Sequence, residues 1–196
     1  MLSFAKPAAE KALQPLGRLL KNVNPNAITM FGLVFPVVFF VLMLHKQYGW
    51  AIVAVILNGV DMLDGMVARA QGKVTAFGGF LDSTIDRFAD FTILAAFGFA
   101  GLVGWNIVLP LIMLAYLISY IRSRTELAAK GKLVANVGIM ERTERLIAVC
   151  AALLLYIWFP HAAVAGQNVI GCMFIVLIIL SIITVGQRVV FAYKKL

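Results

Sequence analysis

The five aspartates of this 196-residue chain all lie between residues 61 and 90, and four of them form two closely spaced pairs. Asp61 and Asp64 are three positions apart, and Asp82 and Asp86 are four positions apart. Because positions three or four apart share one face of an α-helix, each pair predicts a helix with an acidic face. Facing carboxylates repel one another in apolar surroundings, and hard divalent cations are their natural counter-charge. Two such ions, held a few ångströms apart, stabilise both the attacking and the leaving oxygen in phosphoryl transfer.

The sequence around these carboxylates is strongly apolar. Hydrophobic residues make up 62% of the chain and charged residues 13%, and the mean hydropathy is +0.96. A soluble domain is about half apolar and about a quarter charged. Several apolar runs reach about 20 residues, the length that an α-helix needs to cross the hydrocarbon core of a bilayer. The composition therefore predicts an integral membrane protein surrounded by membrane lipids, and we expect no nucleic-acid partner.

We predict an all-α fold with six transmembrane helices, preceded by an amphipathic helix at the membrane surface. The six helices are expected at about 27–45, 50–70, 77–103, 105–128, 143–160 and 165–190. Residues 1–24 interleave leucines with Lys6, Lys11 and Arg18, which is typical of an interfacial helix. Residues 25–196 form one membrane domain. Nearly all basic residues fall on one side of this topology, with Lys46 alone on the other, so both termini and the active site are expected on the cytoplasmic side of the cell membrane.

In this topology Asp61 and Asp64 lie near the end of the second helix, and Asp82 and Asp86 lie near the start of the third. The connection "AQGKVTAFGG", residues 70–79, is rich in glycine and lets the two acidic faces meet. Ion pairing with Arg69, Lys73 or Arg87 is the alternative for any single aspartate, but it does not account for four carboxylates on two facing helices. We therefore expect a divalent metal site at this end of the two helices.

The full spacing of this segment resembles the CDP-alcohol phosphotransferase family. It runs Asp61-x-x-Asp64-Gly65-x-x-Ala68-Arg69, then, after eight residues, Gly78-x-x-x-Asp82-x-x-x-Asp86. The resemblance implies that a CDP-linked lipid donates its phosphatidyl-type group to an alcohol and that CMP leaves. It also implies that two divalent ions, Mg²⁺ or Mn²⁺, are held by Asp61, Asp64, Asp82 and Asp86. Asp86 would in addition be the catalytic general base on the acceptor hydroxyl.

The same resemblance implies a nucleotide site for the CDP-lipid donor. Gly65 and Ala68 are small where the nucleotide would approach the backbone, and Arg69 would pair with the diphosphate. The segment "NPNAIT", residues 24–29, resembles the family's "PNxxT" element, which lines the cytidine pocket. A helix cap is the alternative interpretation of this segment, and both can hold together. The implied nucleotide-binding residues are Asn26, Ala27, Ile28, Thr29, Gly65, Ala68, Arg69, Thr75 and Gly78.

The acceptor alcohol is expected to carry a phosphate. Residues 119–146 contain six cations, more than membrane orientation alone requires, and arginine binds phosphate bidentately. Attraction to anionic lipids is the alternative. This segment and the later "QR" resemble phosphatidylinositol phosphate synthases and their archaeal ether-lipid counterparts, which implies inositol 1-phosphate as the acceptor. Its phosphate would be bound by Arg122, Arg142, Arg145 and Arg188, with Arg122 standing where a lysine is expected.

Other functions remain open at this point. The same chemistry with glycerol 3-phosphate as acceptor also needs a phosphate site. A divalent cation transporter would place acidic residues near mid-span along a through-path, and a noncatalytic scaffold leaves the facing carboxylates unexplained. The family resemblance further implies a homodimer. Asp90, which lies outside the motif, is predicted to be a structural partner for Arg87 or to make a polar helix contact.

Overall fold

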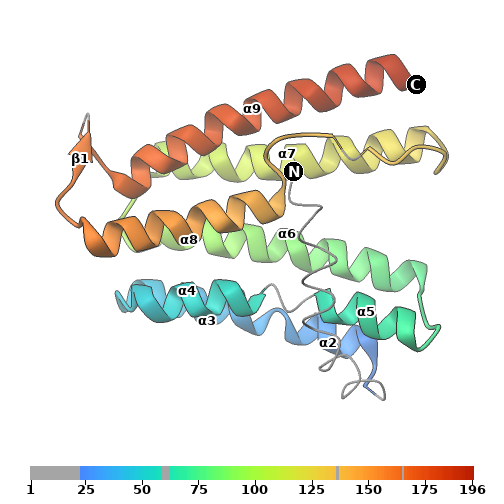
Figure 1. The fold of residues 1–196 in the computed structure, drawn as a ribbon, viewed down its shortest axis with the longest axis horizontal. Helices are drawn as coiled ribbons and strands as arrows, with labels where there is room; N and C mark the ends of the chain where they lie inside the picture. Colours follow the sequence, from blue (N-terminus) through green and yellow to red (C-terminus); the bar gives the residue numbers. More distant parts are fainter. Residues whose placement is uncertain (1–22, 59–61, 136, 165) are drawn as a thin grey trace. The chain divides into compact units, whose positions relative to one another are not determined.

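The computed structural model describes residues 23–58, 62–135, 137–164 and 166–196, without the side chains of residues 62–64. These residues form helices and one short hairpin (Figure 1). The chain divides into two compact units, Met1–Ile93 and Leu94–Leu196, and helix α6 (Ala76–Phe99) passes from the first into the second. Each unit is described by itself. The predicted interfacial helix at 1–24 lies almost wholly outside the described residues.

The first unit contains α2 (Pro25–Phe31), α3 (Val34–Leu44), α4 (Tyr48–Asn58), α5 (Met62–Ala70) and most of α6. Helix α3 packs along α4, and α2 packs against α5. The turn between α3 and α4 has Lys46 in the left-handed region, with φ 58°. This unit therefore carries the segments that hold the predicted metal and nucleotide residues.

The end of α5 is built by a glycine. Gly72 has φ 64°, its N–H donates to the Arg69 carbonyl at 3.2 Å, and the Lys73 N–H donates to the Ala68 carbonyl at 2.9 Å. This pair of bonds is the Schellman arrangement, which uses a left-handed residue to satisfy the last helical carbonyls. The Gln71 side chain then donates to the Val23 carbonyl at 2.9 Å. The start of α2 is thereby tied to the end of α5.

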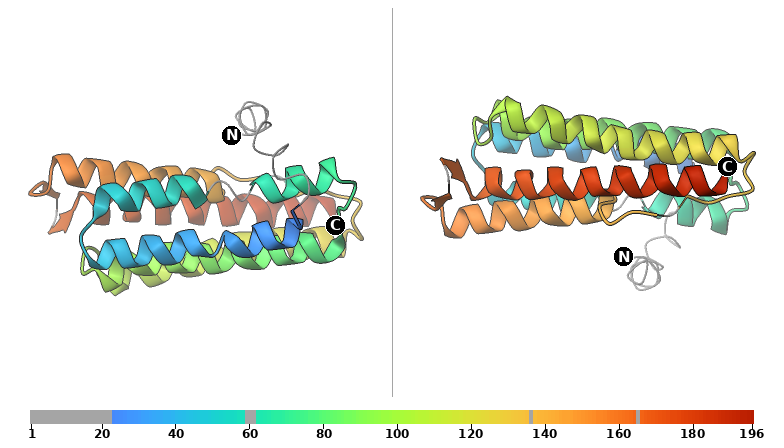
Figure 2. Two further views of the ribbon diagram at one scale, coloured as in Figure 1. Left: turned by 90° about the horizontal axis from the view of Figure 1, so that it is seen from below. Right: turned by 90° about the horizontal axis from the view of Figure 1, so that it is seen from above.

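The second unit contains α7 (Trp105–Ala128), α8 (Arg142–Trp158), the hairpin strands β1 (Ala163–Val164) and β2 (Gln167–Asn168), and α9 (Val169–Lys195). Helices α7 and α8 both pack against α9, and α8 and α9 lie side by side in Figures 1 and 2. The strands are antiparallel, with Ala163 opposite Asn168. Asn168 caps α9 by accepting from the Gly171 N–H at 2.9 Å, and it donates to the Leu102 carbonyl at 2.7 Å. One side chain thus joins the hairpin, α9 and the connection between α6 and α7.

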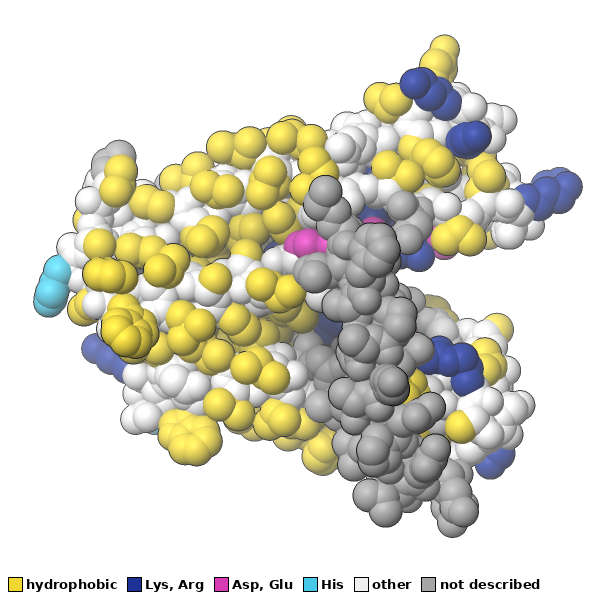
Figure 3. Space-filling view, viewed as in Figure 1, with side chains coloured by type: hydrophobic (Ala, Val, Ile, Leu, Met, Phe, Trp, Pro, Cys, Tyr) yellow, Lys and Arg dark blue, Asp and Glu magenta, His cyan; other side chains and the backbone are white. Residues whose placement is uncertain are grey.

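Among the described residues, three helical stretches are long and apolar enough to cross a bilayer: Pro25–Leu44, Trp105–Ala128 and Val169–Lys195. Most residues in these stretches are not buried within the protein. Figure 3 shows hydrophobic side chains spread along the helices, with Lys and Arg side chains toward helix ends. Such a surface suits a lipid environment. The described part of this membrane protein is helical apart from the hairpin, and the prediction of six spans stays a prediction.

The helix bounds differ from the predicted spans in three places. The first predicted span contains two helices, α2 and α3, which meet at Gly32. The second span, predicted at 50–70, corresponds to α4 and α5 on either side of residues 59–61. The last span was predicted to begin at 165, but the hairpin occupies residues 163–168 and α9 begins at Val169. Strands of two residues are too short to show a periodic pattern.

Candidate active site

The carboxylates on α6 form the described part of the predicted metal site. Asp82 and Asp86 are one helical turn apart, and both are half-buried. The Asp61 residue and the Asp64 side chain lie outside the described residues. Within the described residues there is no group of three or more side chains that could hold a metal ion. The pair on α6 does fit the predicted ions, because two carboxylates on one helix face are donors of the kind that Mg²⁺ and Mn²⁺ prefer.

Arg87 lies beside this acidic face. Its Nη2 is 3.6 Å from Asp86 Oδ2 and 3.8 Å from Asp90 Oδ2. Asp90 is 2% exposed, so its charge needs a nearby partner inside the protein. The predicted role of Asp90 as a partner for Arg87 is confirmed. The guanidinium also brings positive charge close to Asp86.

A pocket of about 430 Å³ opens between the start of α2 and the connection from α5 to α6. Its lining residues are Asn24, Pro25, Asn26, Gly72, Lys73, Val74 and Thr75. Across this connection the Gly78 N–H donates to Thr75 Oγ1 at 3.0 Å. A Cβ atom added to Gly78 would lie 3.1 Å from Thr75 Oγ1 and 3.4 Å from Asn26 Oδ1. The structure therefore brings together three predicted nucleotide residues from two segments: Asn26 on α2, and Thr75 and Gly78 at the start of α6.

The segment "NPNAIT" also caps a helix, as the alternative interpretation proposed. The capping residue is Asn24, whose side chain accepts from the Asn26 N–H at 3.0 Å, and Pro25 occupies the first turn. Thr29 is 3% exposed, and its hydroxyl donates to the Pro25 carbonyl at 3.1 Å. Thr29 thus supports α2 from within, while Ala27 is exposed and Ile28 is half-buried on the same helix.

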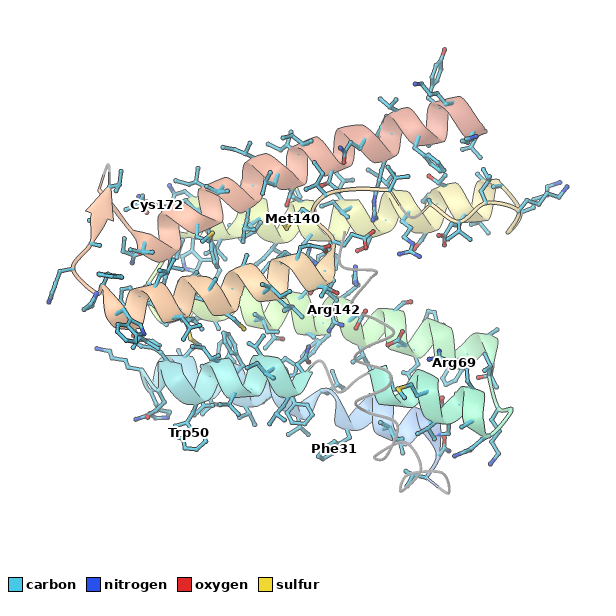
Figure 4. All side chains as sticks on the ribbon, in the orientation of Figure 1. Phe31, Trp50, Arg69, Met140, Arg142 and Cys172 are labelled. Carbon is cyan, nitrogen blue, oxygen red and sulfur yellow. The ribbon has the colours of Figure 1, made fainter. Side chains whose placement is uncertain are left out.

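Gly65 and Arg69 lie one turn apart on α5, where Figure 4 labels Arg69. A Cβ atom added to Gly65 would lie 3.2 Å from Arg69 Nη1. The missing side chain at 65 therefore leaves room for the Arg69 guanidinium, a role that the sequence did not reveal. Ala68, half-buried in the same turn, contributes the carbonyl that closes the helix end.

In the second unit, the predicted acceptor-phosphate residues come from three helices. Arg122 is on α7, Arg142 and Arg145 are in the first turn of α8, and Arg188 is on α9. Arg122 Nε donates to Glu126 Oε1 at 3.0 Å. Arg145 is 2% exposed, whereas the Arg122 side chain is 41% exposed. Figure 4 labels Arg142 where α8 begins.

Arg188 has a structural role that the sequence did not predict. Its Nε donates to the Val137 carbonyl at 2.7 Å, its Nη1 to the Ile118 carbonyl at 2.6 Å, and its Nη2 to Glu141 Oε1 at 3.1 Å. The side chain is buried at 3% exposure. Arg188 therefore joins α9 to α7 and to the α7–α8 connection, residues 129–141. A lone arginine within a long apolar helix was the available signal, since such charges are paired inside the protein.

Two further bonds hold the α7–α8 connection in place. The Met140 N–H donates to Thr184 Oγ1 at 3.0 Å, and the Ala135 N–H donates to Glu126 Oε1 at 3.1 Å. Gly138 has φ 139°, and a Cβ atom there would lie 2.5 Å from Thr184 Cγ2. The connection therefore lies tightly against α9 at a point where only glycine fits.

Comparison with known proteins gives consistent matches along most of the chain. The family model for CDP-alcohol phosphatidyltransferase matches residues 22–186. Archaetidylinositol phosphate synthase of Pyrococcus horikoshii is 38% identical over 199 aligned residues, which cover 100% of this chain and 98% of that protein. Phosphatidylinositol phosphate synthase of Mycobacteroides abscessus is 35% identical over 193 residues, covering 91% of this chain and 82% of that protein.

The fold is also similar to solved structures. Phosphatidylinositol phosphate synthase of Mycobacterium tuberculosis with CDP-DAG bound has a TM-score of 0.76 and 26% identity, covering 91% of this chain and 92% of that chain. The same synthase in complex with manganese and citrate has a TM-score of 0.76 and 27% identity, covering 91% of this chain and 88% of that chain.

Proposed function

This chain belongs to the CDP-alcohol phosphatidyltransferase family, and on that premise we propose that it transfers a phosphatidyl or archaetidyl group from a CDP-linked lipid to inositol 1-phosphate, releasing CMP. The family predicted from the aspartate spacing is confirmed, and the protein is an enzyme of that family. Because the chain belongs to this enzyme family, we exclude the alternatives of a cation transporter and a noncatalytic scaffold. The names of the relatives support the inositol phosphate acceptor.

The observation that carries the acceptor assignment is the group of arginines at the ends of α7, α8 and α9. Arg122 is linked to the α7–α8 connection through Glu126, Arg188 donates to Val137 in that connection, and the first turn of α8 brings Arg142 and Arg145 to its end. Arginine side chains can bind a phosphate bidentately through their planar fork of N–H groups. Three of the five N–H groups of Arg188 already serve Val137, Ile118 and Glu141. We therefore assign Arg188 the shared role of ligand and support, beside Arg122, Arg142 and Arg145 as further phosphate ligands.

The donor is assigned to the pocket beside α2. Asn26, Thr75 and Gly78 would contact the cytidine, with Ala27, Ile28 and Thr29 supporting them from α2, and this placement is favoured by the convergence of Asn26 and Thr75 around Gly78. Arg69 is exposed at the end of α5 and would pair with the diphosphate. Gly65 and Ala68 have small side chains, so that turn of α5 leaves room for the nucleotide. The complex of the tuberculosis synthase with CDP-DAG supports a CDP-linked lipid as donor.

We further propose that Asp61, Asp64, Asp82 and Asp86 hold two divalent ions, Mg²⁺ or Mn²⁺, as suggested by the manganese complex of the related synthase. When bound, such ions neutralise the diphosphate and the developing charge on its oxygens. An Asp86 carboxylate oxygen accepts the proton of the acceptor hydroxyl. The freed oxygen bonds to the lipid-side phosphorus as the bond from that phosphorus to the CMP oxygen breaks. Arg87, 3.6 Å from Asp86, helps to orient the base.

Topology and assembly follow the family pattern in this proposal. The helices would provide six spans, with both termini and the active site on the cytoplasmic side of the cell membrane, and the enzyme would be a homodimer. The basic residues at the ends of α5, α7 and α9 support that orientation, because positive charge is retained on the cytoplasmic side.

The test is an acceptor comparison with purified protein in detergent or lipid. CDP-diacylglycerol or CDP-archaeol is supplied with Mg²⁺ or Mn²⁺ and with either inositol 1-phosphate, glycerol 3-phosphate or free inositol. We expect CMP release, and a lipid product of matching mass, with inositol 1-phosphate. Turnover with glycerol 3-phosphate alone would refute the assignment of the acceptor and leave the donor chemistry standing.

A further inference from the structure

Glu126 connects a predicted phosphate ligand to the α7–α8 connection through a single oxygen atom. Its Oε1 accepts from Arg122 Nε at 3.0 Å and from the Ala135 N–H at 3.1 Å. Arg122 and Glu126 are four residues apart on α7, so they share one helix face. Ala135 is 2% exposed, and its buried N–H needs an acceptor inside the protein. One carboxylate therefore fixes both a side chain and a loop.

Neither bond gives Glu126 a purely structural reason to be charged. The Arg122 and Glu126 side chains are 41% and 34% exposed, and ion pairs so open to solvent add little stability. The side-chain oxygen of a glutamine can also accept a hydrogen bond from the Ala135 N–H. What the negative charge adds is a strong, directed bond to the side of the guanidinium.

The geometry of that bond matters for the other edge of the guanidinium. Arg122 uses its Nε toward Glu126, and the two Nη groups then lie on the outer part of the planar fork. A phosphate binds that outer part bidentately only if the plane is held in one orientation. A lysine, with one ammonium nitrogen, cannot be held from the side and present two donors in a fixed plane. This accounts for an arginine at 122 in a chain that carries a glutamate one turn later.

We propose that Glu126 is a positioning residue for the acceptor phosphate: it orients Arg122 through Nε and sets the position of the α7–α8 connection relative to it. This inference rests on the proposed function, in which Arg122 contacts the acceptor phosphate. Glu141 is related to Arg188 in the same way, because its Oε1 accepts a hydrogen bond from Arg188 Nη2 at 3.1 Å. The acceptor site is thus expected to contain arginines whose direction is set by neighbouring glutamates.

The test is a double-mutant cycle between Arg122 and Glu126, read out as KM for inositol 1-phosphate and KM for the CDP-lipid. Glu126→Gln keeps an acceptor for Ala135 but loses the charge, and we expect it to raise the acceptor KM about threefold to tenfold with the CDP-lipid KM unchanged. Glu126→Ala should raise it further. In an Arg122→Lys background, Glu126→Gln should change the acceptor KM less than twofold, because coupled residues are non-additive. Lys132→Gln, an exposed residue of the same connection, is the control and should match wild type.

Each outcome decides the matter. Additive effects in the cycle, or a Glu126→Gln enzyme with unchanged acceptor KM, would overturn the positioning role, and a lower thermal stability alone would show that Glu126 serves the loop. Glu126→Gln guards against the case in which Glu126→Ala does not fold. If the wild-type enzyme turns over a different phosphate-bearing acceptor and not inositol 1-phosphate, the proposed function is refuted but the positioning role of Glu126 is not. The same double-mutant cycle, measured with that acceptor, then tests Glu126.

Discussion

Replacing Arg188 by lysine should destabilise the second unit even when no substrate is present. The guanidinium donates to Val137, Ile118 and Glu141 from three different nitrogen atoms. A lysine ammonium occupies only one of those three positions, so two acceptors lose their donor. Arg188 is 3% exposed, so water cannot readily replace the donors to the two main-chain carbonyls if the ammonium stays with Glu141.

The size of the effect follows from the two lost bonds. Hydrogen bonds that involve a charged group contribute about 1.5–3 kcal/mol each, so Arg188→Lys should lower the free energy of unfolding by about 3–6 kcal/mol. In a chain of this length, 1 kcal/mol corresponds to about 2–4 °C in Tm. We therefore expect the Tm to fall by at least about 6 °C.

The measurement is thermal unfolding of detergent-solubilised protein, followed by tryptophan fluorescence without acceptor or CDP-lipid. Lys194→Ala, at an exposed position on the same helix, is the matched control and should unfold at the wild-type temperature. An Arg188→Lys protein that unfolds within about 2 °C of wild type, yet no longer turns over, would refute the reasoning. It would mean that the guanidinium serves the substrate and not the connection.

Three further predictions concern the donor side and the chemistry. Asp86→Asn should reduce kcat at least about 100-fold while the Tm and much of the CDP-lipid binding are retained, because the proton acceptor and one metal ligand are lost but the amide keeps the shape of the side chain; undiminished turnover would remove Asp86 from the base role. Gly78→Ala should raise the CDP-lipid KM several-fold without lowering Tm, since its Cβ would lie 3.1 Å from Thr75 Oγ1 and alanine favours the helix. Gly79→Ala, where a Cβ meets nothing within 4 Å, is its control, and equal KM values for the two variants would contradict the pocket assignment. Chelation by EDTA should abolish CMP release and either Mg²⁺ or Mn²⁺ should restore it, whereas persistent turnover in EDTA would exclude metal dependence.

Sequence patterns predicted long helices well where an apolar run ends at a charged or glycine-rich segment. Helix α7 spans Trp105–Ala128 against a predicted 105–128, and α8 spans Arg142–Trp158 against 143–160. The break at Gly32 was not predicted, because an apolar run shows no interruption when the residues on both sides are equally hydrophobic. The hairpin before α9 was not predicted for a different reason, because its strands are only two residues long.

In the candidate site, the structure places Asn26 beside the Thr75–Gly78 turn, and the roles of these residues in nucleotide binding stay predictions. The roles of Arg122 and Arg188 toward an acceptor phosphate stay predictions as well. The bonds from Arg188 to two main-chain carbonyls could not be predicted, because every residue has a carbonyl and no residue type marks which of them lacks a partner. The carboxylates of Asp61 and Asp64 stay a prediction.

The amide of Gln71 reaches Val23 across 48 positions of sequence, and this distance has a consequence for biosynthesis. One wall of the pocket beside α2 leaves the ribosome long before the other. If this pocket binds the nucleotide, as proposed, a nascent chain halted ahead of the α5–α6 connection would carry α2 yet have no affinity for CMP. The nucleotide can therefore assist maturation only after the first unit has assembled, and arrested chains of increasing length should acquire CMP binding in a single step.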